Sequence, residues 1–123
     1  MALPAGARTR VGDDARAEPR VRLRTPVELL ASTRCGPVLL PGVLVDLSAA
    51  GCALRLGLPL EPGVPVRLVL ALGRDRLPVL GEVIWAKPRE RTWVLGIRFE
   101  RLAPAKRAAI VRCIFSARRL RQA

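Results

Sequence analysis

The chain has 123 residues, which is enough for one domain and too short for two. Half of the residues are apolar but only 3% are aromatic, so the composition predicts an aliphatic core and excludes a wholly disordered chain. The 22 basic and 10 acidic residues give a formal charge of +12, concentrated in residues 1–24 and 98–123, so we expect anionic partners.

The residue types that most enzymes and metal sites need are scarce. The sequence contains no histidine, and its three cysteines, Cys35, Cys52 and Cys113, are far apart and odd in number. Without histidine a zinc site and the commonest general base are both missing, and the scattered acids form no carboxylate cluster. The sequence therefore predicts a protein that is not an enzyme and that needs no metal or cofactor.

No part of the sequence indicates export or a membrane span. No stretch approaches the roughly 20 apolar residues that cross a bilayer. Residues 1–15 contain Arg8, Arg10, Asp13 and Asp14 and lack the apolar stretch of a signal peptide, so we expect a flexible tail there. Thiols without a disulfide pattern fit a reducing compartment. The expected location is the cytoplasm, either free or at the cytoplasmic face of a membrane assembly.

After this tail, residues 16–24 form a basic linker, and β signals follow. Short apolar or alternating stretches separated by Gly and Pro predict strands over residues 26–32, 42–48, 52–56, 64–72, 77–86 and 91–99. The connections are too short for helical crossovers, so the strands form an antiparallel barrel or sandwich within residues 25–101.

The final segment changes period. Pro104 suits the first turn of a helix over residues 104–119, and a basic end follows at residues 120–123. Apolar residues recur at helical spacing and predict one stripe that packs on the barrel. They are Ala108, Ile110, Val111, Ile114, Phe115 and Ala117. All four aromatic residues, Trp85, Trp93, Phe99 and Phe115, are expected in the core.

Two short motifs suggest a site for a guanine nucleotide. Arg16 and Arg20 can grip phosphate or the N7 and O6 edge of guanine, and Asp46 can accept from the N1 and N2 donors of guanine. Ser48 can add one hydrogen bond, and Gly51 permits an unusual backbone angle and a close ligand approach. Each motif also has a structural explanation, since arginines are common in a basic tail and Asp-x-Ser before Gly is a frequent turn.

In combination these motifs resemble the PilZ family. Arg16-Ala17-Glu18-Pro19-Arg20 is similar to its Arg-x-x-x-Arg motif, and Asp46-Leu47-Ser48-Ala49-Ala50-Gly51 to its (Asp/Asn)-x-Ser-x-x-Gly motif. Residues 81–85 and 96–99 add weaker similarity, so the resemblance spans residues 16–119. It implies a six-stranded antiparallel β-barrel closed by a C-terminal helix. It also implies a ligand site for cyclic di-GMP made of Arg16, Arg20, Asp46, Ser48 and Gly51.

The resemblance implies a receptor in which the ligand orders residues 16–24 and so transmits a signal to a protein partner or a fused synthase or motility component. Residues 110–117 also resemble the helix of the PilZ domain in bacterial cellulose synthases. The alternative is a PilZ-like adaptor that binds a protein and not the nucleotide. A nucleic-acid partner is disfavoured, because such barrels stack bases on exposed aromatic residues.

Overall fold

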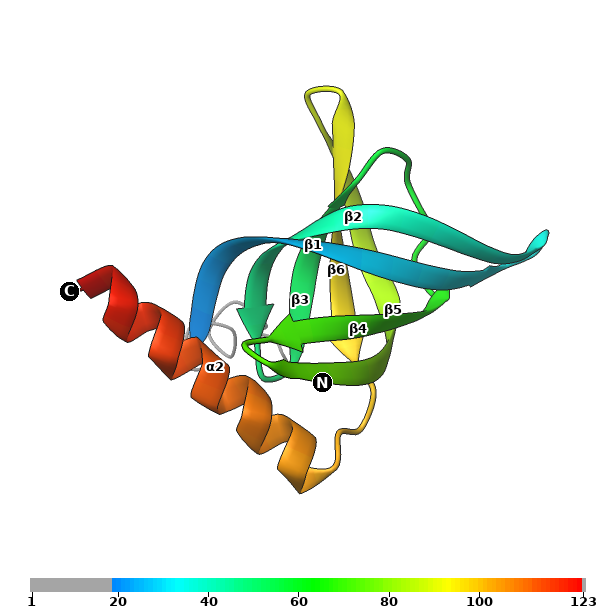
Figure 1. The fold of residues 1–123 in the computed structure, drawn as a ribbon. Coiled ribbons are helices and arrows are strands. Elements are labelled where there is room, and N and C mark those ends of the chain that lie inside the picture. Colours follow the sequence, from blue (N-terminus) through cyan, green and yellow to red (C-terminus); the bar gives the residue numbers. More distant parts are fainter. Residues whose placement is uncertain (1–18, 123) are drawn as a thin grey trace, which may run out of the picture.

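A computed structural model describes residues 19–122, with side chains as far as residue 118. Six antiparallel strands close into a barrel in the order β1-β2-β3-β6-β5-β4, and one helix follows them (Figure 1). This confirms the predicted fold class. The elements are β1 Arg20–Thr33, β2 Gly36–Ser48, β3 Gly51–Leu56, β4 Pro65–Leu72, β5 Asp75–Arg89, β6 Thr92–Phe99 and α2 Pro104–Gln122.

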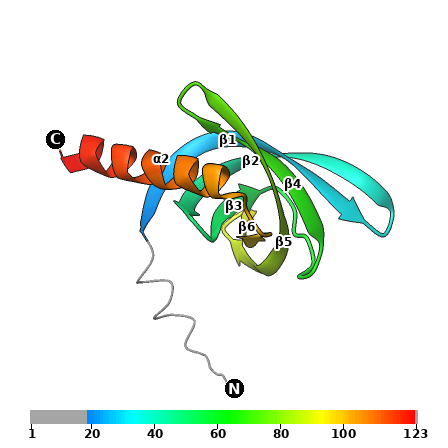
Figure 2. The same cartoon turned by 90° about the horizontal axis from the view of Figure 1, so that it is seen from below.

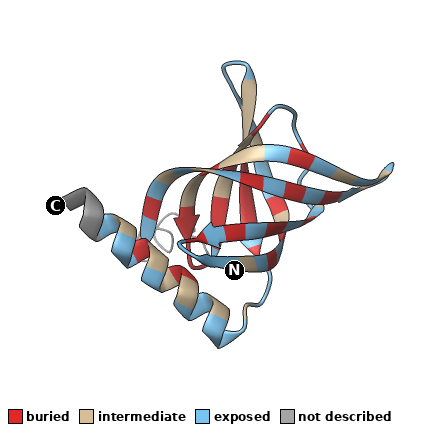
Figure 3. Cartoon of the chain, in the orientation of Figure 1, coloured by how far each residue is buried: buried red, intermediate tan, exposed pale blue. Residues whose placement is uncertain are grey.

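The barrel is filled with aliphatic side chains from every strand. Inward and outward residues alternate most clearly along β4, where Val66, Leu68, Leu70 and Leu72 are buried and their neighbours are exposed (Figure 3). Val, Leu and Ile fill a small barrel well because their branched side chains pack between adjacent strands. The inner surface therefore provides the stability, and the outer surface is free to carry function.

Strand β1 begins at Arg20, six residues before the predicted start at residue 26. The expected linker over residues 16–24 is therefore strand from Arg20 onward. Arg20, Arg22 and Arg24 are exposed, whereas Val21 is buried and Leu23 is half-buried between them. This alternation is that of a strand with arginines on its solvent face. The expected tail over residues 1–15 and Arg16 lie outside the described residues.

Strand β2 begins at Gly36, although Gly36, Pro37, Pro41 and Gly42 predicted loops. Pro37 pairs with Ser32 and Pro41 with Glu28 on β1, whereas pairing with β3 starts only at Gly42. Over residues 36–41 the second edge of β2 is therefore open, and proline, which lacks an N–H donor, is tolerated in such an edge strand. The result is a long β1–β2 hairpin that projects beyond the barrel wall (Figure 1).

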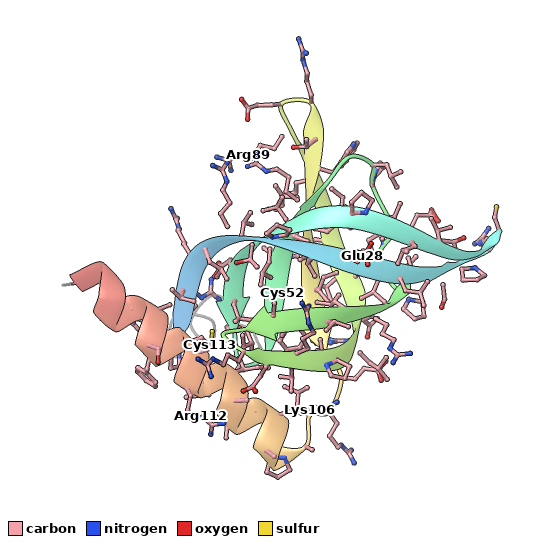
Figure 4. All side chains as sticks on the ribbon, in the orientation of Figure 1. Glu28, Cys52, Arg89, Lys106, Arg112 and Cys113 are labelled. Atoms are coloured by element: carbon pink, nitrogen blue, oxygen red, sulfur yellow. The ribbon has the colours of Figure 1, made fainter. Side chains whose placement is uncertain are left out.

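Helix α2 lies across the end of the barrel from which β1 begins (Figure 2). Ile110 and Ile114 are fully buried against the barrel, and the Lys106 ammonium donates to the Pro78 carbonyl oxygen at 2.7 Å (Figure 4). The predicted stripe is only half right, because Ala108 and Phe115 lie on the opposite, exposed side of the helix. Among the described residues, no helix is long and apolar enough to cross a membrane.

The three cysteines are free thiols in very different surroundings. Cys35 is exposed in the β1–β2 turn, Cys113 is half-buried on α2, and Cys52 is buried inside the barrel. Burial raises the pKa of the Cys52 thiol far above its ordinary value, and the nearby Asp46 carboxylate raises that pKa further. Burial also raises the pKa of Cys113. Because the thiolate is the reactive form, both cysteines are protected from alkylation in the folded state.

We predict that iodoacetamide at mildly alkaline pH modifies Cys35 first, Cys113 more slowly and Cys52 only when the protein unfolds. Peptide mass spectrometry over time measures the three rates. Denaturant should remove the difference, since all three thiols then have ordinary pKa values. Modification of Cys52 at the rate of Cys35 in the native protein would contradict the barrel interior described above.

Candidate functional site

The pairing of β1 with β2 brings the two sequence motifs together on the outer barrel surface. Arg20 lies opposite Ser48, and Arg22 lies opposite Asp46. Because side chains of directly opposed residues share one face of a sheet, Arg20 of the first motif and the nearby Arg22 lie on the same face as Ser48 and Asp46 of the second. Of the predicted site residues, Arg20, Asp46, Ser48 and Gly51 belong to the described structure, whereas Arg16 lies outside the described residues.

Arg20 and Asp46 approach each other without forming a close pair. The distance from Arg20 Nη1 to Asp46 Oδ2 is 3.6 Å, which is too long for a good hydrogen bond. The Arg20 side chain is 48% exposed and that of Asp46 is 30% exposed. The other carboxylate oxygen, Asp46 Oδ1, is buried and has no hydrogen-bond donor among the described residues. Within residues 19–118 this carboxylate oxygen therefore has no donor and can accept from a ligand.

Ser48 uses its hydroxyl group to hold the turn between β2 and β3. The hydroxyl donates to the Gly51 carbonyl oxygen at 3.2 Å and accepts from the backbone N–H groups of Ala50 and Gly51 at 3.3 Å. Ser48 is buried, and these bonds occupy its one donor and both acceptor positions. The structure therefore gives Ser48 a positioning role, and its direct contact with a ligand remains a prediction.

Gly51 allows β3 to pack tightly against β6. It pairs with Arg98, and a Cβ atom at this position would collide with the Ile97 carbonyl oxygen. Its φ angle is outside the left-handed region, so the unusual backbone angle expected from the sequence is wrong. Gly51 is also buried, and the close approach that it permits is to the neighbouring strand. Its role in the described structure is to hold the turn against β6.

Trp85 forms the far side of the same surface. Asp46 pairs with Ala53, Ala53 with Gly96, and Gly96 with Trp85, so these residues form one row across β2, β3, β6 and β5. The Trp85 indole lies on Gly96, where a Cβ would collide with the ring. The ring thus covers Gly96, and the small residue Ala53 leaves a low floor between Asp46 and the ring.

The expectation that Trp85 belongs to the core is wrong. The β5–β6 register shifts between Val83 and Trp85, so both Ile84 and Trp85 are exposed instead of alternating. Such a bulge re-aims the following side chain. The Lys87 ammonium lies 5.2 Å from the Trp85 ring centre, within the range of a cation–π contact. A bulge has no clear sequence signature here, so strand alternation alone could not identify this residue.

Arg55 is a second residue that the motifs do not indicate. It lies two residues from Ala53 on β3, pairs with Val43 and Val94, and shares the outer surface with Asp46. Its Nε atom is buried and has no hydrogen-bond partner within residues 19–118. Together with Arg20 and Lys87 it makes this surface cationic, which favours phosphate-containing ligands. No group of His, Cys, Asp or Glu that could hold a metal ion occurs in the described part of the chain.

Comparison with known proteins identifies the family. The family described as PilZ domain matches residues 14–116. No curated protein matches the chain. A solved structure of the PilZ domain of YcgR from Escherichia coli with c-di-GMP is similar, with a TM-score of 0.70 and 20% identity over 85% of this chain and 92% of that one.

Two further solved structures share the fold. The Bacillus subtilis inhibitor of motility MotI has a TM-score of 0.69 and 17% identity over 86% of this chain, but this chain covers only 51% of it. The PilZ domain of CeSA from a cellulose-synthesizing bacterium has a TM-score of 0.59 and 21% identity over 80% of this chain and 97% of that one. At such low identities the likeness shows the fold alone.

The packing of Gly51 leads to a test of its role. We predict that Gly51→Ala lowers the free energy of unfolding by about 1–3 kcal/mol, because the new methyl group meets backbone atoms that cannot move aside. Gly57→Ala is the matched control, since it has open space around it and should change stability by less than about 0.5 kcal/mol. Urea unfolding measures both variants. Equal stability of the two would contradict the structural role of Gly51.

Proposed function

The chain belongs to the PilZ family, and we propose on this basis that it is a receptor for cyclic di-GMP that catalyses no reaction. The observation that supports the proposal most directly is the open pair of Arg20 and Asp46 beside the Ser48 turn. Both side chains are partly exposed and oppositely charged, and Asp46 Oδ1 has no hydrogen-bond partner among the described residues. They can therefore bind a ligand that offers both donors and acceptors without first breaking a strong bond.

A guanine nucleotide has the chemistry that this pair needs. The N1 and N2 groups of guanine are adjacent donors that match a carboxylate, so they would satisfy Asp46. Its O6 and N7 atoms, and the phosphates, are acceptors that match the planar guanidinium of Arg20. A base can also lie on the floor formed by Ala53, with Trp85, which covers Gly96, as its side wall. These roles assign recognition of the base and phosphate to residues on β1, β2, β3 and β5.

The finer part of the proposal concerns the signal. We propose that bound c-di-GMP is held by Arg16 together with Arg20, and that this fixes the residues before β1 on the barrel. Residues 20–24 already belong to β1, so the ordering step can involve only residues before Arg20. A ligand that binds the ordered arrangement more tightly shifts the population toward it, and a protein partner or fused module can respond to that shift.

We predict that calorimetric titration of the full chain with c-di-GMP shows saturable binding that GTP does not reproduce. Arg20→Ala and Asp46→Ala should each weaken binding about 10-fold or more, because each removes a hydrogen-bonding charged group. Trp85→Ala should weaken it to a similar degree by loss of stacking, which is worth about 1–3 kcal/mol per base.

Arg76→Ala is the matched control, because Arg76 is an exposed β5 arginine that pairs with Ala71 outside the candidate site. It should bind like the unmodified protein. Thermal unfolding of every variant shows whether the barrel is intact. Absence of both binding heat and ligand-induced stabilisation in the unmodified chain would contradict the receptor function and favour the protein-binding adaptor.

A further inference from the structure

A second surface of the barrel carries exposed apolar side chains that the nucleotide site does not use. The residues are Leu30 on β1, Leu39 on β2, Val69 on β4 and Leu80 on β5, and we call them the apolar belt. Their exposed fractions are 37%, 60%, 42% and 52%. Neighbouring exposed apolar residues are unusual on a monomer, and contiguous patches of this kind mark interaction surfaces.

The strand register shows that the belt is continuous. Leu39 pairs with Leu30, Leu30 with Arg67, and Arg67 with Leu80, so a row across β2, β1, β4 and β5 holds three belt residues, with Arg67 between Leu30 and Leu80. Val69 lies two residues from Arg67 on the same face of β4. Leu30 is ten residues beyond Arg20 along β1, so the belt and the candidate nucleotide site occupy different parts of this long strand.

Two opposite charges lie within the belt. Glu28 is exposed on β1 (Figure 4), and Arg67 is exposed on β4. Leu30 pairs with Arg67, so Glu28, two residues before Leu30, is a diagonal neighbour of that arginine on the same face. Neither side chain has an ion-pair or hydrogen-bond partner among the described residues. The belt thus combines apolar side chains with one free acid and one free base, and its own net charge is zero.

We propose that this belt is a dimer interface that binds the same belt of a second copy of the chain. In a two-fold symmetric interface, residue i of one copy contacts residue j of the other, and the reverse contact follows by symmetry. Glu28 of each copy can then pair with Arg67 of its partner, while the leucines pack between the two barrels. The inference is independent of the proposed nucleotide binding.

The charge distribution favours a second copy over an acidic partner. The excess positive charge of the chain is in its terminal segments, and these, not the belt, would attract an acidic protein or a nucleic acid. A patch with one charge of each sign is complementary to itself. Proline also makes edge-to-edge strand pairing unfavourable, since Pro37 and Pro41 lie on the open edge of β2. Packing of the outer faces is therefore the favoured geometry.

Analytical ultracentrifugation of the full chain without nucleotide tests the interface. The unmodified protein should show a monomer–dimer equilibrium between low micromolar and submillimolar concentration. Leu39→Lys and Leu80→Lys should each raise the dimer dissociation constant at least about 10-fold, since each places a charge in the apolar contact. Leu58→Lys is the matched control, because Leu58 is 44% exposed but lies outside the belt, and it should dimerise normally.

A charge swap makes the test specific for reciprocal contacts. Glu28→Arg and Arg67→Glu should each weaken the dimer, because each creates like charges across the interface. The double variant Glu28→Arg/Arg67→Glu should restore it. All positions are exposed, so circular dichroism should show intact folding in every variant. A monomer at all concentrations, an equal effect of Leu58→Lys, or no recovery in the double variant would overturn the proposal.

Discussion

The pairing register between β1 and β2 is the constraint on which the candidate site depends. It sets Arg20 opposite Ser48 and Arg22 opposite Asp46, and it does so by aligning inward residues such as Val21 and Leu47 in the core. A slip by one residue would turn every side chain of β1 to the other face and would bury the arginines. The hydrophobic core therefore determines which charged residues meet on the surface, although none of the core residues contacts a ligand.

Small residues and the β2–β3 turn form the rest of the candidate nucleotide site. Ser48 closes the β2–β3 turn, and Gly51 lets that turn lie directly against β6. The same strand pairing extends the row of Asp46 through Ala53 and Gly96 to Trp85. Residues far apart in sequence thus form one surface that is cationic at one side and aromatic at the other. The outer surface of a single small barrel offers a second, apolar region around Leu30 and Leu80 without disturbing the first.

The elements and site residues that depend on a pattern within a few consecutive residues could be predicted from the sequence. The alternation over residues 92–99 and the change of period after Pro104 identified β6 and α2, and the spacing of Asp46, Ser48 and Gly51 identified the turn. Features that depend on contacts between residues far apart in the chain could not be predicted from the sequence. Pro37 and Pro41 looked like loop residues because their tolerance in β2 depends on an edge with no neighbour. Arg20 to Arg24 looked like a linker because their charge concealed the alternation with Val21 and Leu23. Trp85 became exposed through a bulge, and Phe115 because the helix buries a different side.

Amide NMR tests most directly whether c-di-GMP binds the outer surface between Arg20, Asp46 and Trp85. In a titration of the isotope-labelled chain, we expect shifts confined to residues 16–22, 46–53 and 96 and to the indole N–H of Trp85. The indole of Trp93, which pairs with Leu56 on the inner side, serves as the internal reference and should move little. Shifts centred on α2 or on the Leu30–Leu80 face, with Trp85 unchanged, would contradict binding at this surface.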